Sequence, residues 1–569
     1  MIKTRKVVLT IILLLVLQFS SSAFTVYSDS TRLSQSEGKI ITNIYINNID
    51  VSGPSIHDGE DWKPDIFGKI GNALHFKTKT WVIKNILLFK KGEKLDPQSI
   101  EDSERLLRES GYFYDAAIAT ESAGKPGEVN VYVSTKDKWT LDPQISYSPK
   151  SRNGYLGLKD KNFLGIGHSA GLLVTHDEDS YIGWGGKFDY TINNLKGSFI
   201  NASLNLASNN KSNLFRMSLS RSFVVTQIKW AGGLDLTWEH DDLRFLNGSK
   251  NFTLIPHSYD SQDLWVGRSF KMPVISGLTG NNSSFVLSGR YFRKHYRIRP
   301  PVSPDSNKIF ENHRLYLVSL GAINRKFYKS YYVSEFGVTE DIPVGGMAAL
   351  TTGSDSREFY NRWYYGAQLI YSAHFNRVGY FSGNFEVGGF RYSDKWEQNT
   401  IRFDLIYHSP LVTRDGWKAR FLVQNNYILG FNRFEGEQIY LNRAAGMPGF
   451  NEFAIAGVKR NVLDLEMRLF TPYDILGFVI GGIAFADYAL ISGENQNLLS
   501  SRVYQGYGFG LRTQNQSISK TNFELALVYN PYNPVSGAAK TEIIFSAAFV
   551  LGSRNFNFGE PATINFSEQ

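Results

Sequence analysis

Three short motifs contain residue types that could support chemistry. The pentapeptide GHSAG at residues 167–171 fits a nucleophile elbow, in which Ser169 would sit on a turn between a strand and a helix. The segment LLVTH that follows alternates like a strand, which disfavours a hydrolase. The motifs HDGED at 57–61 and HDED at 176–179 resemble solvated loops more than cation sites, and the ten His show no HExxH spacing. We therefore expect no enzyme, no metal and no cofactor.

A second group of charged residues lies on one face of a strand. Residues 462–470 alternate, with Asp464, Glu466 and Arg468 on one side and apolar residues on the other. The next apolar segment contributes Asp487. In a soluble sandwich the polar face would meet water, whereas in a membrane barrel it would line the lumen. The rest of the chain favours the barrel.

The start of the chain predicts export. Residues 1–23 have the form of a secretory signal peptide, with three basic residues, an apolar run at 7–17, and small residues at positions 21 and 23. The 569 residues contain no cysteine, which excludes a disulfide framework, a lipid-bearing cysteine and thiolate metal sites. The formal charge of +8 is a small excess, so no nucleic-acid partner is inferred.

Composition and periodicity predict an all-β transmembrane barrel for residues 141–552. The chain has 51 Gly, 40 Phe, 31 Tyr and 10 Trp but is only 42% hydrophobic, which is typical of neither a soluble domain nor a helical membrane protein. Segments of about ten residues with alternating polarity recur, up to nineteen by this count. Long loops are expected at 243–260, 296–313 and 334–358, and a C-terminal tail at 553–569. Closure is required because an open sheet edge in lipid would leave backbone groups unpaired.

Residues 39–137 predict a separate α+β unit. A strand at 40–47 is followed by a helix at 80–89 and a second helix capped by Asp96, with Pro97 at its first position and Gly111 at its end. A hairpin of residues 112–120 and 128–134 completes a β-α-α-β-β order.

The run VIKNILLFKKGEKLDPQSIEDSERLLRESGYFYDAAI at 82–118 resembles a POTRA module of the BamA/TamA outer-membrane assembly-factor, or surface-antigen, superfamily. The resemblance implies about 16 antiparallel barrel strands in the outer membrane of a Gram-negative-type bacterium, with the module in the periplasm. It also implies that an exposed sheet edge of the module binds extended polypeptides by strand addition. Only one such module is evident, so the chain is similar to a short member of the superfamily.

The same resemblance gives meaning to a long lumenal loop at 430–458. Family members carry in this loop an apolar residue, Arg, Gly and an aromatic, at positions held here by Met447, Pro448, Gly449 and Phe450. The Arg is therefore missing, and a plain turn is the alternative interpretation.

The carboxylates that pair with that Arg in the family correspond to Glu466 and Asp487. Buried carboxylates are costly unless they are paired or hydrated, so we expect Arg443 or Arg468 to supply the guanidinium.

A seam is expected where the first barrel strand, 141–149, meets the last, 542–551, which contains Phe545. Pro143 cannot donate a hydrogen bond to a ladder. The resemblance implies that this seam opens sideways, whereas the simpler alternative is that Pro143 only ends a linker.

The sequence thus predicts a non-enzymatic outer-membrane protein that assembles, inserts or translocates polypeptides. Its expected partners are nascent or unfolded outer-membrane or exported polypeptides, membrane lipid and accessory lipoproteins. Two alternatives remain open. One is a two-partner-secretion-type translocation pore or passive channel, and the other is a barrel phospholipase, which would need Ser and His on the same outer surface.

Overall fold

The structure is a computed structural model of the whole chain. It describes residues 33–54, 56, 66–148, 153–177, 183–209, 212–247, 251–272, 282–443, 445–450, 455–475, 478–515, 523–534, 540–547 and 558–566. The predicted signal peptide at 1–23 and the motif at 57–61 lie outside these residues.

The N-terminal module is a small α+β unit. Its elements are β1 (Ile40–Ile49), α3 (Ile66–Leu74), α4 (Thr80–Ile86), α5 (Pro97–Glu109), β2 (Phe113–Ser122) and β3 (Glu128–Asp137). The sheet order is β1-β3-β2, with β1 parallel and β2 antiparallel to β3. The carboxylate of Asp96 accepts the N–H groups of Gln98 and Ser99 and so caps α5. The module has the expected element order plus one further helix, α3.

The barrel is a closed antiparallel sheet. Its strands are β4 (Leu141–Ser148), β5 (Asn153–Phe163), β6 (His168–Asp177), β7 (Gly183–Ile192), β8 (Asn201–Ser208), β9 (Asn213–Arg221), β10 (Trp230–Asn247), β11 (Asn251–Lys271), β12 (Ser283–Ile298), β13 (His313–Ser330), β14 (Glu340–Arg357), β15 (Asn361–Phe375), β16 (Gly379–Tyr392), β17 (Lys395–His408), β18 (Val412–Arg414), β19 (Trp417–Phe431), β22 (Lys459–Ile475), β23 (Phe478–Ser492), β24 (Tyr504–Asn515), β25 (Phe523–Tyr529) and β26 (Thr541–Ala547). Short 3-10 turns are η1 (Leu195–Gly197), η2 (Lys308–Phe310) and η3 (Leu498–Ser500). Two short strands, β20 (Ile439–Tyr440) and β21 (Ala456–Gly457), pair within the long loop.

The barrel class is confirmed, and the described strands fill more places than the resemblance implies. Since β17 and β18 both pair with β19, they share one place, and the described circuit has twenty places rather than about sixteen. Five strands follow the long loop, as expected from the sequence. Before it, β4 to β9 are strands of eight to eleven residues that pair in chain order.

Two of the expected long loops are strands instead. Residues 243–247 and 251–260 form the paired ends of β10 and β11, whose ladder continues to Asn247 opposite Asn251. Most of 334–358 is β14. A ladder needs only backbone groups, so clusters of polar side chains at strand ends do not stop it.

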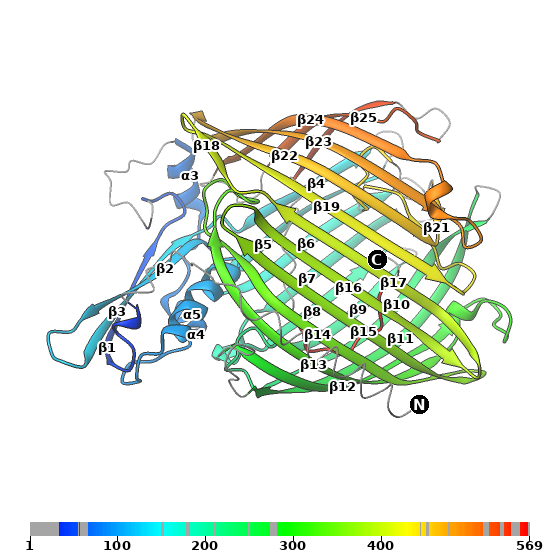
Figure 1. Ribbon diagram of the computed structural model, residues 1–569, viewed down its shortest axis with the longest axis horizontal. Coiled ribbons are helices and arrows are strands. Elements are labelled where there is room, and N and C mark those ends of the chain that lie inside the picture. Colours follow the sequence, from blue (N-terminus) through cyan, green and yellow to red (C-terminus); the bar gives the residue numbers. More distant parts are fainter. Residues whose placement is uncertain are drawn as a thin grey trace.

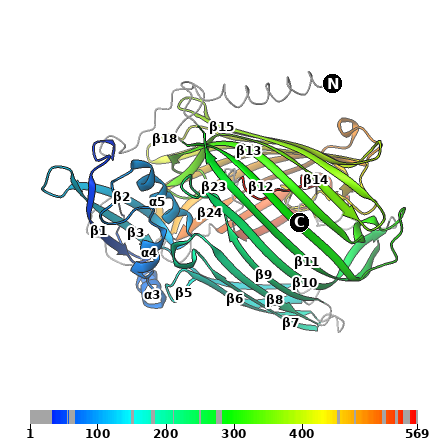
Figure 2. The ribbon, with the colours of Figure 1, turned by 90° about the horizontal axis from the view of Figure 1, so that it is seen from below.

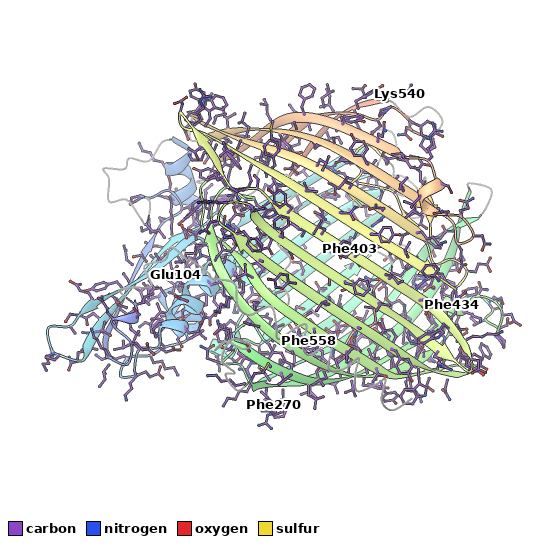
Figure 3. The ribbon with its side chains drawn as sticks, in the orientation of Figure 1. Glu104, Phe270, Phe403, Phe434, Lys540 and Phe558 are labelled. Atoms are coloured by element: carbon purple, nitrogen blue, oxygen red, sulfur yellow. The ribbon has the colours of Figure 1, made fainter. Side chains whose placement is uncertain are left out.

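The outer face is apolar and the inner face is polar. On β22, Leu465 and Met467 are 38% and 37% exposed, whereas their neighbours Glu466 and Arg468 are buried inside. Phe270 and Phe403, labelled in Figure 3, likewise belong to the exposed apolar side chains of the wall. This alternation is the pattern of a barrel that spans a bilayer. Among the described residues, no helix is both long and apolar enough to cross a membrane.

The module covers one end of the barrel, as both ribbon views show (Figure 1 and Figure 2). We call this the module end and the opposite one the far end. The chain enters β4 from the module, so the turn between β13 and β14 lies at the module end and the long loop between β19 and β22 at the far end.

Candidate functional site in the barrel lumen

The long loop between β19 and β22, called here the central loop, folds onto the inner wall. Its apolar side chains Leu441, Met447 and Phe450 are almost completely buried. They pack against wall residues of β22 and β23, namely Val462, Ala489 and Ile491. The loop is therefore part of the packed interior of the barrel.

The tip of the central loop is held by an amide and by close backbone contact. The side chain of Asn530 donates from Nδ2 to the carbonyl of Pro448 at 3.2 Å. Gly449 has φ +82° and lies so close that a Cβ would come within 2.1 Å of the same Nδ2. Only glycine fits this conformation and this distance without strain.

Both expected wall carboxylates face the lumen. Glu466 is 9% exposed and Asp487 is 4% exposed. Asp487 lies directly across the ladder from Asp464. The central loop approaches Asp464 at Gly446, whose Cβ would lie 2.9 Å from either carboxylate oxygen. The loop thus meets the acidic wall with glycine backbone rather than with a basic side chain.

Of the two arginines expected to replace the missing one, Arg468 contacts the acidic wall. Its Nε donates to Glu466, and its Nη1 donates to the carbonyl of Val333 in the turn at the module end. Arg443 has an exposed side chain, and its carbonyl accepts the N–H of Gly446 at 3.1 Å. Arg468 therefore ties the wall to the module end, not to the central loop.

Two residues that hold the central loop were missed. Arg460 on β22 donates from Nη1 to the carbonyl of Tyr440 in the loop at 2.8 Å and from Nη2 to Asn426 at 2.9 Å. Its position on the same face as Glu466 and Arg468 was a usable signal. Asn530 follows the end of β25, and nothing in the local sequence marks it.

The turn at the module end, residues 331–339, crosses the mouth of the barrel. We call it the rim turn. It leaves from β13 but contacts β22 to β24: the ring of Phe336 lies 5.1 Å from that of Phe470, and the N–H of Phe336 donates to Gln514. Glu340 accepts backbone N–H groups of the turn from Val333 and Ser334 at 2.8 to 3.0 Å. The rim turn is therefore fixed across the module end of the lumen.

The module is clamped to the same rim. Arg108 of α5 binds Asp341 through two hydrogen bonds of 2.6 and 2.7 Å. Glu104 of α5, labelled in Figure 3, bonds to Arg108 at 2.6 Å and to Lys329 of β13. Burial by itself would raise the pKa of Glu104, but Arg108 and Lys329 outweigh burial and lower that pKa.

The outer edge of β2 is partly occupied within the module. Arg108 donates to the carbonyl of Ala116 at 2.8 Å, and Glu104 accepts the N–H of Ile118 at 3.0 Å. These two edge groups are satisfied by α5. Further along β2, the same alternation places the backbone groups of Thr120 and Ser122 on this edge.

A third segment of the chain fills the lumen. Residues 558–566, called here the tail, follow the last strand, and their deep red ribbon lies within the outline of the barrel in both ribbon views (Figure 1 and Figure 2). Phe558 and Phe566 are 9% and 4% exposed. The sequence predicted a tail at 553–569 but not its position.

The seam lies between the last strand and the first strand of the barrel, since β26 lies beside β4 in the closed circuit. The described part of β26 has seven residues and β4 has eight, against 18 for β13 and for β14. Pro143 of β4 stands opposite Leu158 of β5. Phe545 of β26 is 69% exposed and stacks on Phe523.

The nucleophile-elbow motif lies in a strand. Ser169 and His168 are consecutive residues of β6, so their side chains point to opposite faces of the wall. His168 contacts the hydroxyl of Tyr190 at 2.7 Å. The motif therefore lacks the strand-to-helix turn that a nucleophile elbow requires.

Comparison with known proteins identifies the module. The POTRA family model, described as surface antigen variable number repeat, matches residues 70–136. No curated protein sequence matches the chain. Similar solved structures include CdiB from Escherichia coli, with 12% identity, a TM-score of 0.42, and coverage of 93% of this chain and 80% of that one. Another is BamA from Haemophilus ducreyi lacking POTRA domains 1-3, with 13% identity, a TM-score of 0.36, and coverage of 88% and 83%. These likenesses are weak, so functional inference rests on the geometry of this chain.

Proposed function

We propose that this chain, which joins a POTRA module to a closed transmembrane barrel, assembles or translocates polypeptides at the outer membrane of a Gram-negative-type bacterium. The observation that carries the proposal is the clamp that fixes the module over the module-end mouth of the barrel, through Arg108 and Asp341. A polypeptide that adds to the module's sheet edge is thereby delivered to the barrel rim. The module would lie in the periplasm, and accessory lipoproteins would be further partners.

Client capture is assigned to the outer half of β2. The edge groups of Ala116 and Ile118 are engaged by α5, and the same alternation places the backbone groups of Thr120 and Ser122 on the outer edge of β2. Strand addition needs free N–H and C=O groups in register, and this part of the edge can offer them.

Assembly into the membrane would use the seam. The described part of β26 has seven residues and β4 has eight, and Pro143 removes one donor from β4. Opening the seam would break the hydrogen bonds between these two strands and expose an edge on which a nascent strand can form. The folding of the client would supply the free energy.

Translocation through the lumen is the second candidate, and the tail favours it. Nine residues of the tail already lie along the inner wall between Val286 and Ile428, so a polypeptide segment that displaced the tail could take the same place in the lumen. A passive channel is less well supported, because the central loop, the rim turn and the tail all pack inside. A barrel phospholipase would need Ser169 and a His on one face, and His168 points to the other.

Depletion of the protein in cells, followed by quantitative proteomics of the outer membrane and the medium, tests the proposal. Broad loss of outer-membrane proteins supports assembly, and loss of one exported protein supports translocation. Unchanged protein compositions of both the outer membrane and the medium would contradict the proposal. A Ser169→Ala variant with normal growth and normal lipid composition would remove the phospholipase alternative.

A further inference from the structure

We call the part of the inner wall that the tail contacts the groove, and the places where a wall glycine leaves room for a tail side chain its slots. Three wall glycines, Gly321 of β13, Gly388 of β16 and Gly430 of β19, each face a tail side chain. A Cβ at Gly321 would come within 2.7 Å of the Phe558 ring, and one at Gly430 within 2.4 Å of the Phe566 ring. Any larger residue would fill these slots, so the wall and the tail are complementary in shape.

The second slot combines a glycine with a hydroxyl. A Cβ at Gly388 would come within 2.9 Å of Ile564, and the hydroxyl of Tyr364 accepts the N–H of Ile564 at 2.8 Å. The tail forms no ladder with the wall, so a side chain takes over a bond that a neighbouring strand would otherwise make.

A charged contact is also present in the groove, and it comes from the guanidinium of Arg290 on β12. Arg290 of β12 is oriented by Asp263, with Nε 2.8 Å from Oδ1. Its Nη1 donates to the carbonyl of Pro561 at 2.9 Å and lies 3.0 Å from a carboxylate oxygen of Glu560. An arginine held in this way can receive both the backbone and an acidic side chain of an extended peptide.

The groove runs from the module end to the far end. Phe558 packs with Val286, close to the first residue of β12 at the module end, whereas Phe566 packs with Ile428 and with Ile439 of the central loop at the far end. Nine extended residues reach roughly 30 Å, about the thickness of the hydrocarbon core. The groove is therefore long enough to follow a polypeptide across the membrane.

The groove is continuous with the place where the module would deliver a client. A cavity of about 620 Å³ lies between α5, β2 and the barrel rim, and Phe558 lines it together with Ala119 of β2. Figure 3 shows Phe558 within the barrel and Glu104 on the module side. A segment that leaves the edge of β2 therefore meets the first slot of the groove.

We propose that this groove is a peptide-binding site, that the tail occupies it in cis, and that a client segment of the same chemistry displaces the tail. That chemistry is an extended chain with an aromatic residue, an acidic residue two positions later, and an aliphatic and a second aromatic residue six and eight positions after the first. The client part of the proposal rests on the function proposed above. Peptide binding to the purified protein does not, so the two can fail separately.

The test uses the full chain with Phe558→Ser and Phe566→Ser, which empties the terminal slots. A fluorescent peptide of residues 556–569 is added in detergent and its anisotropy is measured. We expect saturable binding to this variant, with binding to the unsubstituted chain weaker by at least about tenfold because its tail competes in cis. A Gly/Ser host peptide that carries only the Phe, Glu, Ile and Phe at the same spacing should also bind.

Matched wall variants locate the site. In the variant with the emptied slots, Gly321→Val should weaken peptide binding by about tenfold to a hundredfold, because it fills the slot of a buried Phe. Gly383→Val on β16 is the control, because its Cβ would meet nothing within 4 Å and it should leave binding unchanged. Retained heat-modifiability shows that each barrel is folded.

Three results would overturn the proposal: no saturable binding by the variant with emptied slots, equal binding of a scrambled peptide, or equal effects of Gly321→Val and Gly383→Val. Binding of the tail peptide without binding of the host peptide would overturn the client part, since the groove would then accept only its own tail.

Discussion

Replacing Gly449 by alanine should release the tip of the central loop from the wall. The residue has φ +82°, and its Cβ would stand 2.1 Å from Nδ2 of Asn530, a side chain that is 1% exposed. Neither the backbone at residue 449 nor the buried amide of Asn530 can move without a loss of free energy. The substitution therefore acts on loop docking rather than on the strands.

The magnitude follows from two contributions. A non-glycine residue in the left-handed region costs about 1 kcal/mol. Moving the loop away from Asn530 also breaks its 3.2 Å bond to Pro448 and leaves a buried amide unpaired, which costs about 1–3 kcal/mol. Together these amount to roughly 2–4 kcal/mol, or about a 30-fold to 1000-fold rise in the undocked population.

Native-state proteolysis measures that population. Trypsin should cut at Arg443 in proportion to the fraction of undocked loop, provided that opening is fast compared with cleavage. We expect the cleavage rate of Gly449→Ala to rise by the factor above. Gly493→Ala is the control, because its Cβ would meet nothing within 4 Å and its rate should stay unchanged.

A double-mutant cycle sharpens the test. Adding Asn530→Ala to Gly449→Ala removes the atom that the Cβ would meet, so the two effects should be strongly non-additive. A Gly449→Ala chain cleaved at the unsubstituted rate, or strictly additive effects, would refute the docking described here.

Three further predictions concern other contacts of the lumen. Arg468→Ala should lower barrel stability by about 3–5 kcal/mol because it strands Glu466 in the interior, whereas the exposed Arg443→Ala should stay within about 0.5 kcal/mol in urea unfolding; equal effects would contradict this. The folded-state pKa of Glu104 is lowered, so its contribution to the clamp is present above the unfolded pKa near 4.5 and is lost as pH falls through the lowered folded-state pKa; hydrogen exchange of α5 should rise as pH falls below 4.5, and a Glu104→Gln chain that keeps the same pH dependence would oppose it. The tail variant with emptied terminal slots should conduct more than the unsubstituted chain in planar bilayers, and unchanged conductance would show that the tail does not limit the lumen.

The strands and their faces could be predicted because alternation is local. Val462 to Phe470 alternate in sequence, and the same side chains alternate between lumen and exterior in the structure. The caps of α5 at Asp96 and Pro97 were likewise readable within a few residues. The strand number was harder, because short strands and loop fragments have similar patterns.

Local sequence patterns could not predict the contacts between segments inside the lumen. Arg108 reaches Asp341 across 233 positions, and Arg290 reaches Pro561 across 271. Residues so far apart along the chain cannot be recognised as partners from their spacing in the sequence. The resemblance to the surface-antigen superfamily led us to expect Arg443 or Arg468 beside the wall carboxylates, and Arg468 contacts Glu466. The central loop itself is held by the amide of Asn530 and by Arg460 of the wall.

The most direct test of the proposed activity is reconstitution in liposomes. An unfolded outer-membrane polypeptide is presented to vesicles that contain this protein, with its module outward, and to empty vesicles, and both membrane folding and passage into the protected interior are followed. The account predicts that the protein accelerates one of these two processes. Equal rates of both processes in the two kinds of vesicle would contradict it.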